Sequence, residues 1–154
     1  MRGRLLVGPV ASMRPQVDDT VATLRRLAAH TSVTTAALGR LDPDFLRQER
    51  LRLTHARESA RPEIAAELDR AISALTAQEE VHARLSATRE RLLVRLESTV
   101  IVLEGLVARV VELSAMDVTS GTDTPAALDH LTADLEITRQ SLHDLDEETR
   151  GDQP

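Results

Sequence analysis

Residues 62–116 decide the fold, and they read PEIAAELDRAISALTAQEEVHARLSATRERLLVRLESTVIVLEGLVARVVELSAM. Within this stretch proline occurs only as the first residue, Pro62, and glycine only as Gly105. Proline steers the residue before it away from helical backbone, so Arg61 marks a boundary. The two residue types that end helices are otherwise almost missing, so the stretch predicts one helix of about 62–116. At 1.5 Å per residue, such a helix would be roughly 80 Å long.

Apolar residues recur along this stretch with a seven-residue repeat, the pattern of a coiled-coil seam. Of the fifteen core positions of the repeat, eleven are apolar. The a positions are Leu68, Leu75, His82, Arg89, Leu96, Leu103 and Val110, and the d positions are Ile64, Ala71, Gln78, Leu85, Leu92, Thr99, Leu106 and Leu113. We expect helix packing to be carried by Leu68, Leu75, Leu85, Leu92, Leu96, Leu103, Leu106, Val110 and Leu113.

Three polar residues interrupt the middle of the seam. Polar groups at core positions set the register and the number of partners at some cost in stability, which is the role we expect of Gln78, His82 and Arg89. Alternatively, the helix is exposed to solvent there. From Leu92 onward the e positions are apolar as well, which widens the predicted packing face to that of a bundle helix. These e positions are Leu93, Val100 and Val107.

Two shorter helices are predicted before the long one. The first starts after Pro15 and stops at Gly39, with its seam at Val17, Val21, Leu24, Ala28, Thr31, Thr35 and Leu38. Asp42 followed by Pro43 is typical of a cap and a first helical residue. The second helix therefore runs from Pro43 to about Glu58, with Phe45, Leu46, Leu53 and Ala56 as its apolar candidates.

One helix is predicted after the long one, beyond a polar loop at 117–124. Thr124 and Pro125 again indicate a cap and a first turn, and the seam is Leu128, Leu131, Leu135, Thr138, Leu142 and Leu145. A loop this short favours an antiparallel return. The return would bring Leu128 near Leu113, Leu135 near Leu106, and Leu145 near Leu96. It would also place the acidic run Asp144, Asp146, Glu147 and Glu148 beside Arg91 and Arg95.

The sequence therefore predicts an all-α protein, an elongated helical bundle or coiled coil around one long central helix. We expect a flexible basic tail at 1–15, a single domain at 16–150 and a short tail at 151–154. The chain has no cysteine, and Phe45 is its one aromatic residue. Its core must therefore consist of interdigitated aliphatic side chains, and we expect a reducing, cytoplasmic location.

No group of residues predicts catalysis, a cofactor or a metal. Glu79 and His82 share a helix face, but a bundle metal site needs a second such pair and further carboxylates from facing helices. Ser141, His143 and Asp144 lie on one amphipathic helix, whereas a catalytic triad converges on a pocket from separate elements. We expect a protein that is not an enzyme.

Charge and hydropathy argue against nucleic acid and against a membrane span. The net charge is −6, made up of −9 over residues 112–154 and +3 over residues 1–111. A positive charge of +3 over residues 1–111 is too small to indicate a nucleic-acid-binding surface. The most apolar stretch, 92–113, contains five charged residues, and membrane spans carry few or none. A weak contact of residues 1–14 with a membrane surface stays open.

In composition, these long helices rich in Arg, Glu, Leu and Ala resemble bacterial coiled-coil scaffold proteins. We expect a helical scaffold or assembly module whose partner is a second copy of itself or another helical protein. Two alternatives stay open: a regulatory or ligand-sensing helical bundle, and the cytoplasmic helical arm of a larger, membrane-associated protein.

Overall fold

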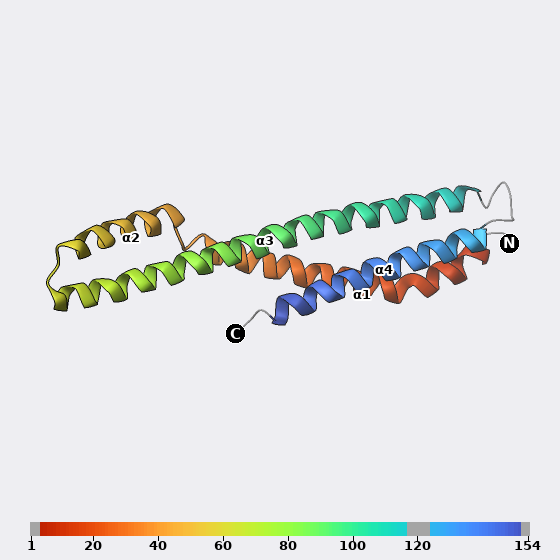
Figure 1. The fold of residues 1–154 in the computed structure, drawn as a ribbon. Helices are drawn as coiled ribbons and strands as arrows, with labels where there is room; N and C mark the ends of the chain where they lie inside the picture. Colours follow the sequence, from red (N-terminus) through yellow and green to blue (C-terminus); the bar gives the residue numbers. More distant parts are fainter. Residues whose placement is uncertain (1–3, 117–123, 152–154) are drawn as a thin grey trace. The chain divides into compact units, whose positions relative to one another are not determined.

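The computed structural model describes residues 4–116 and 124–151, and these fold into four α-helices without a strand (Figure 1). The helices are α1 (Arg4–Leu38), α2 (Pro43–Glu58), α3 (Pro62–Met116) and α4 (Thr124–Gly151). The all-α class is confirmed, and so is the continuous helix predicted for residues 62–116. Residues 117–123 of the predicted loop and the end at 152–154 lie outside the described residues, and Thr124 begins α4.

Local sequence signals explain where α2 begins and ends. The Asp42 side chain accepts hydrogen bonds from the backbone N–H groups of Asp44 (3.0 Å) and Phe45 (3.2 Å), and Pro43 occupies the first turn. These two bonds satisfy donors that the first turn of a helix leaves unpaired. The bounds predicted for α2 are confirmed. Of its predicted apolar contacts, Leu46 is buried, but Phe45 is exposed.

The first helix begins earlier than the sequence predicted. α1 starts at Arg4 and continues through Pro9 and Pro15, whereas we expected a tail followed by a helix after Pro15. A proline inside a helix costs about 3 kcal/mol. The burial of Met13 in a leucine core offers a compensating gain, because packing stabilises a helix beyond its intrinsic propensity.

The contacts of the chain divide into two compact units. Unit 1 comprises Met1–Ala29 and Val94–Pro154, and unit 2 comprises His30–Leu93. Helices α1 and α3 each contribute a segment to both units. The sequence predicts a single domain, so cooperative unfolding of the two units stays a prediction.

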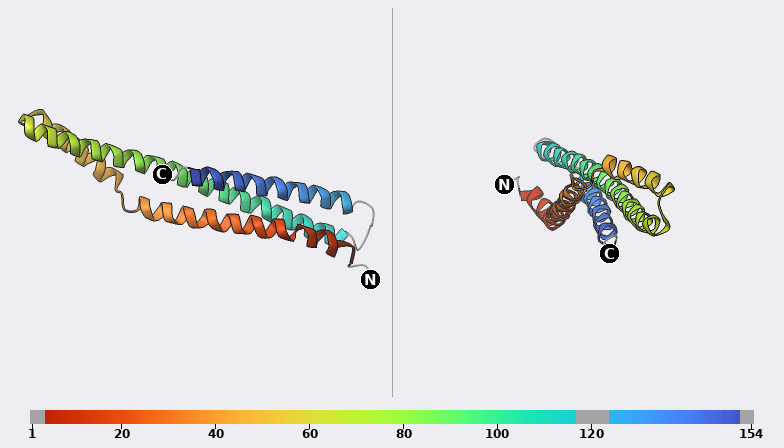
Figure 2. Two further views of the ribbon diagram at one scale, coloured as in Figure 1. Left: turned by 90° about the horizontal axis from the view of Figure 1, so that it is seen from below. Right: turned by 90° about the vertical axis from the view of Figure 1, so that its left-hand side faces the viewer.

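Unit 1 is a three-helix bundle in which α4 lies beside both α1 and α3 (Figures 1 and 2). One core cluster joins the three helices: Met13 of α1, Leu106 of α3, and Leu128, Leu131 and Leu135 of α4, with Leu103, Val110 and Leu113 packed against them. Leu113 shares one hollow with Ala127 and Leu131, and Arg95 shares another with Leu145. Earlier residues of α3 thus lie beside later residues of α4, which confirms the antiparallel return.

Ion pairs fix the register of α1 along α4. Arg139 donates from Nη1 to Asp19 Oδ2 (3.0 Å), and Arg26 Nε lies 3.5 Å from Asp146 Oδ2. The two pairs are seven residues apart on each helix, so α1 and α4 run parallel. Arg139 also forms a hydrogen-bonded pair with Glu136, which lowers the pKa of that carboxyl.

The predicted position of the acidic run is confirmed in part: Asp144 and Glu148 line one hollow with Arg95, but Asp146 does not face α3. Asp146 is buried and lies between Arg26 and Arg150, and no ion pair within the described residues joins the run to Arg91 or Arg95. The reason is that α4 turns Asp146 towards α1 and not towards α3. Asp146 Oδ2 lies 2.9 Å from Arg150 Nη2 without hydrogen-bond geometry, so charge attraction alone holds this contact.

The inward face of α1 differs from the predicted seam. Over residues 11–38, whose burial is described, the buried residues are Met13, Thr20, Thr23, Leu27, Thr31 and Thr34, whereas Val17 is 40% exposed. Threonine can take core positions here because its hydroxyl finds a partner on its own helix. Thr20 Oγ1 donates to the Gln16 carbonyl (2.7 Å), and Thr34 Oγ1 donates to the His30 carbonyl (2.9 Å).

Unit 2 depends more on polar contacts. In it, α2 lies alongside the first half of α3 (Figure 1). Arg50 of α2 donates to Glu79 of α3 (3.0 Å), and Arg57 of α2 forms a two-bond pair with Asp69 of α3. The hydrogen bonds to Arg57 lower the pKa of Asp69.

Candidate interaction site

The leucine seam predicted to carry helix packing is used within the chain. Leu103, Leu106, Val110 and Leu113 pack in the core of unit 1, and Leu92 is fully buried. The other predicted seam leucines are half-buried: Leu68, Leu75, Leu85 and Leu96. The seam is therefore largely occupied, and a partner would have to bind another face of α3.

The three polar seam residues have different surroundings. Arg89 Nε donates to Thr35 Oγ1 (2.9 Å), so it connects α3 to the end of α1 inside unit 2. His82 is half-buried, and Gln78 is exposed. Arg89 thus makes a contact between helices, as a register-setting residue should, but its role in register stays a prediction, as do those of Gln78 and His82.

The pair Glu79 and His82 is not joined by further metal ligands. Glu79 receives the ion pair from Arg50, and the described residues contain no group of three or more side chains that could hold a metal ion. Ser141, His143 and Asp144 follow one another along α4, where Asp144 accepts a hydrogen bond from Gln140 (2.9 Å).

An apolar strip covers the side of α3 turned away from the core of unit 1. It consists of five aliphatic residues at the e, b and f positions of the repeat, which are neighbours on a helical wheel. We call it the outer stripe: Val94, Val100, Ile101, Val107 and Val111. Their exposed fractions lie between 45% and 63%.

The outer stripe corrects the predicted packing of the e positions. We expected Leu93, Val100 and Val107 to widen the packed face, but all three are exposed. The reason is that α4 and Met13 meet α3 along its a and d positions, which leaves the e positions outside. Their apolar character was visible in the sequence, but the side from which the neighbouring helices approach was not.

Two carboxylates lie within the outer stripe. Glu97 and Glu104 occupy b positions between its aliphatic residues, and both are exposed. Neither forms an ion pair within the described residues. The stripe is therefore apolar with negative charge along its middle, which favours a partner helix that carries basic side chains beside an apolar face.

A shallow groove runs along unit 1 between α3 and α4. Three open hollows of about 470, 430 and 390 Å³ lie along it. They share lining residues: Arg109 and Asp134 line two of them, and Ile137 also lines two. We call this feature the α3/α4 groove. From Ala127 to Glu148 it is roughly 30 Å long at the rise of a helix.

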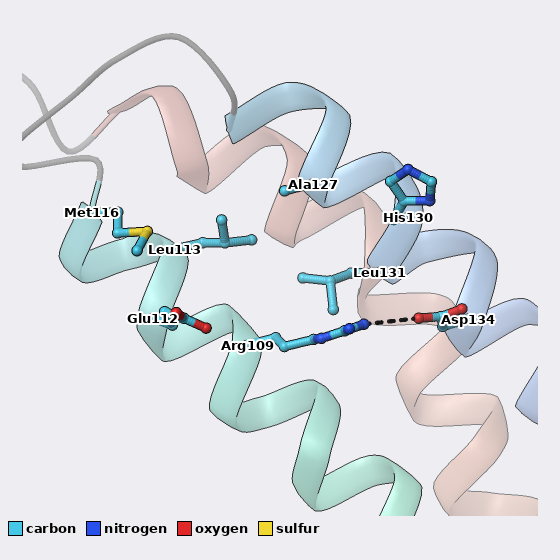
Figure 3. Close-up of a pocket in the computed structure, with 8 residues that line it drawn as sticks. All are labelled: Arg109, Glu112, Leu113, Met116, Ala127, His130, Leu131 and Asp134. Atoms are coloured by element: carbon cyan, nitrogen blue, oxygen red, sulfur yellow. Dashed lines mark hydrogen bonds and ion pairs between the residues drawn. The ribbon is translucent and has the colours of Figure 1, made fainter.

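At one end of the α3/α4 groove, an ion pair connects its two walls (Figure 3). Arg109 Nη1 donates to Asp134 Oδ2 (3.2 Å) above a floor formed by Leu113 and Leu131. Arg95 and Glu148 lie on the same two walls two heptads further along and line one hollow, but they form no ion pair within the described residues. The walls are thus bridged at one end and open at the other.

Within the described residues, no helix contains an 18-residue window apolar enough to cross a membrane. Comparison with models of protein families, with curated proteins and with solved structures finds no match for this chain.

Proposed function

We propose that this chain is a non-enzymatic helical assembly module that binds another helical protein through the outer stripe of α3. One observation carries the proposal. Residues 94–111 of α3 are aliphatic on the side packed in unit 1, and they are also aliphatic on the opposite, exposed side. A helix with aliphatic residues on two opposite sides is typically packed against neighbours on both of them.

The size of the outer stripe supports this proposal. Its five half-exposed aliphatic side chains form a strip along about five turns of α3. Contiguous exposed apolar patches on a protein surface often mark binding sites. A second helix laid along the strip would remove this surface from water, which is the main source of favourable free energy in association.

The alternatives need different surfaces. A ligand-sensing bundle would need a hollow that encloses a small molecule, whereas the three hollows of the α3/α4 groove are open along the helices. A helical arm of a larger protein would use the outer stripe in the same way, with the partner supplied by that protein. The cysteine-free sequence fits a reducing compartment, and we propose a cytoplasmic location on that ground.

The proposal is tested by placing charge on the outer stripe. We expect the variant Ile101→Glu with Val107→Glu to lose the partners that the wild-type chain captures from its native cell. The matched control is Val33→Glu, because Val33 is similarly exposed (68%) but lies on α1 outside the stripe. Circular dichroism should show the same helix content for all three proteins. If the stripe variant captures the same partners as the control, the proposal is wrong.

A further inference from the structure

The two walls of the α3/α4 groove differ in charge. The α3 wall presents Arg95 and Arg109 and, at the end beyond Arg109, Glu112, whereas the acidic residues of the α4 wall are Asp134, Asp144 and Glu148. Arg109 and Asp134 pair with each other across the groove at 3.2 Å. Arg95 and Glu148 are exposed and have no ion-pair partner within the described residues. The open end of the groove thus offers one cation and two carboxylates to another molecule.

This distribution of charge is self-complementary under one kind of symmetry. A two-fold axis parallel to the helices places the α3 wall of one copy against the α4 wall of the other, at the same level along the axis. Arg95 then faces Asp144 and Glu148 of the second copy, and the same contacts occur twice. A two-fold axis across the helices would instead place like walls together, and like charges facing each other cost several kcal/mol.

The floor of the groove suits contact with another pair of helices. Val102 and Ile137 are 42% and 68% exposed there. Gly105 lies between the two walls, and a Cβ atom added to it would meet nothing within 4 Å. A second α3/α4 pair would cover these residues, and the α3 and α4 helices of the two copies would then form a four-helix arrangement.

We propose that the α3/α4 groove is a self-association site, at which two copies of this chain form a parallel dimer held by Arg95 of each copy and Glu148 of the other. The inference rests on the proposed function only in treating the chain as an assembly module. It uses a different surface, since the groove residues occupy the c and g positions of α3 and the outer stripe occupies the e, b and f positions.

The test measures the sedimentation of the purified full-length chain from micromolar to near-millimolar concentration. We expect a monomer–dimer equilibrium for the wild type. Arg95→Glu and Glu148→Arg should each raise the dissociation constant about tenfold or more, because each places like charges together at two sites. Arg25→Glu is the control, since Arg25 is an exposed arginine of α1 without an ion-pair partner within the described residues, and it should leave the constant unchanged.

Mixing the two variants shows whether the contact is between copies. In a mixed dimer of Arg95→Glu with Glu148→Arg, one of the two contacts has its charges exchanged and the other keeps the wild-type pair. Both contacts then join opposite charges, so an equimolar mixture should associate as tightly as the wild type. A pair formed within one chain would give no such rescue. As a second probe, Gly105→Phe should fill the groove and abolish the dimer while the helix content is kept.

The inference is wrong if the wild type is a monomer at every concentration, or if the charge variants dimerise like the wild type. It is equally wrong if the mixture fails to associate. The double variant of the outer stripe should still dimerise, so failure of the proposed function and failure of this inference give different results.

Discussion

Units 1 and 2 use the same long helix with very different packing. In unit 1, the second half of α3 and all of α4 enclose a leucine core that includes Leu106, Leu131 and Leu135. In unit 2, Leu46 and Leu92 are the buried leucines, and ion pairs such as Arg50–Glu79 connect α2 to α3. Exposed ion pairs contribute only about 0–1 kcal/mol each. We therefore expect unit 2 to be the less stable part.

The difference shows that a heptad repeat predicts which residues of a helix face its neighbours, but not how deeply those residues are buried. The a and d positions of α3 are at least half-buried in both units, apart from Ile64 and Gln78. In unit 1, Leu106 is buried where α4 supplies Leu128, Leu131 and Leu135 to the same core. The facing surface of α2 supplies arginine side chains instead.

The largest effect should come from truncating one buried leucine in each unit. Leu135→Ala should lower the free energy of unfolding by about 2–5 kcal/mol, because Leu135 is 2% exposed in the three-helix core. Leu46→Ala, at 4% exposure in unit 2, should cost less, since fewer buried neighbours surround it. Urea unfolding followed by circular dichroism measures both changes.

Amide hydrogen exchange on the same two variants shows which helices each substitution destabilises. Leu46→Ala should speed exchange in α2 and in residues 62–93 and leave α4 unchanged. If it speeds exchange in α4 as much as in α2, the two units unfold as the single domain that the sequence predicted, and their difference in stability disappears.

A smaller effect is expected from exchanging glycine and alanine on the exposed surface of α3. Gly105→Ala in unit 1 should stabilise the chain by about 1 kcal/mol, because alanine is the better helix former and the site has room for a Cβ atom. Ala77→Gly in unit 2 should destabilise it by a similar amount if α3 melts as one helix. Thermal unfolding compares the two, and a change at only one site would show that the halves of α3 melt separately.

The smallest effect should come from acidification. The pKa of Asp69 in unit 2 is lowered by its hydrogen bonds from Arg57, and the pKa of Glu136 in unit 1 is lowered by Arg139. A carboxyl whose pKa falls on folding stabilises the folded state above its unfolded pKa, and this contribution is lost as the pH falls through the folded value. Both units should therefore lose some stability in acid, as the pH falls below the ordinary pKa values of aspartate and glutamate.

The measurement is a carboxyl titration by NMR, with unfolding recorded at neutral and at acidic pH. Asp69→Asn and Glu136→Gln should each flatten the acid dependence slightly. If both carboxyls titrate at their ordinary pKa values, the exposed arginine pairs do not persist in solution, and ion pairing cannot be what holds α2 in unit 2.

Helix ends and the main seam could be predicted because they depend on local chemistry. Asp42 and Pro43 define the start of α2 through capping and a fixed φ angle. The scarcity of glycine and proline after Pro62 predicts the length of α3. Leucines at steps of three and four predict the face of α4, and its seam residues are buried or half-buried.

The start of α1 and the exposure of the e positions of α3 could not be predicted, because they depend on neighbours distant in sequence. Pro9 and Pro15 argue locally against a helix, and the packing of Met13 with leucines of α3 and α4 was invisible to that argument. Val17 resembled a core residue more than Thr20 did, yet Thr20 is buried. The predicted antiparallel return already placed Glu148 beside Arg95, but the open hollow that the two residues line required the structure.

The threonines on the inward face of α1 have a consequence for how firmly this helix is held. Thr20 and Thr34 donate to carbonyl groups of α1 itself, so their hydrogen bonds are intact whether or not α1 touches its neighbours. Separating the helix from its neighbours would leave no hydroxyl of these two residues without an acceptor. The hydroxyl groups that water would then reach keep their own acceptors. Reversible release of α1 should therefore cost less free energy than release of α4, whose inward face consists mostly of leucines.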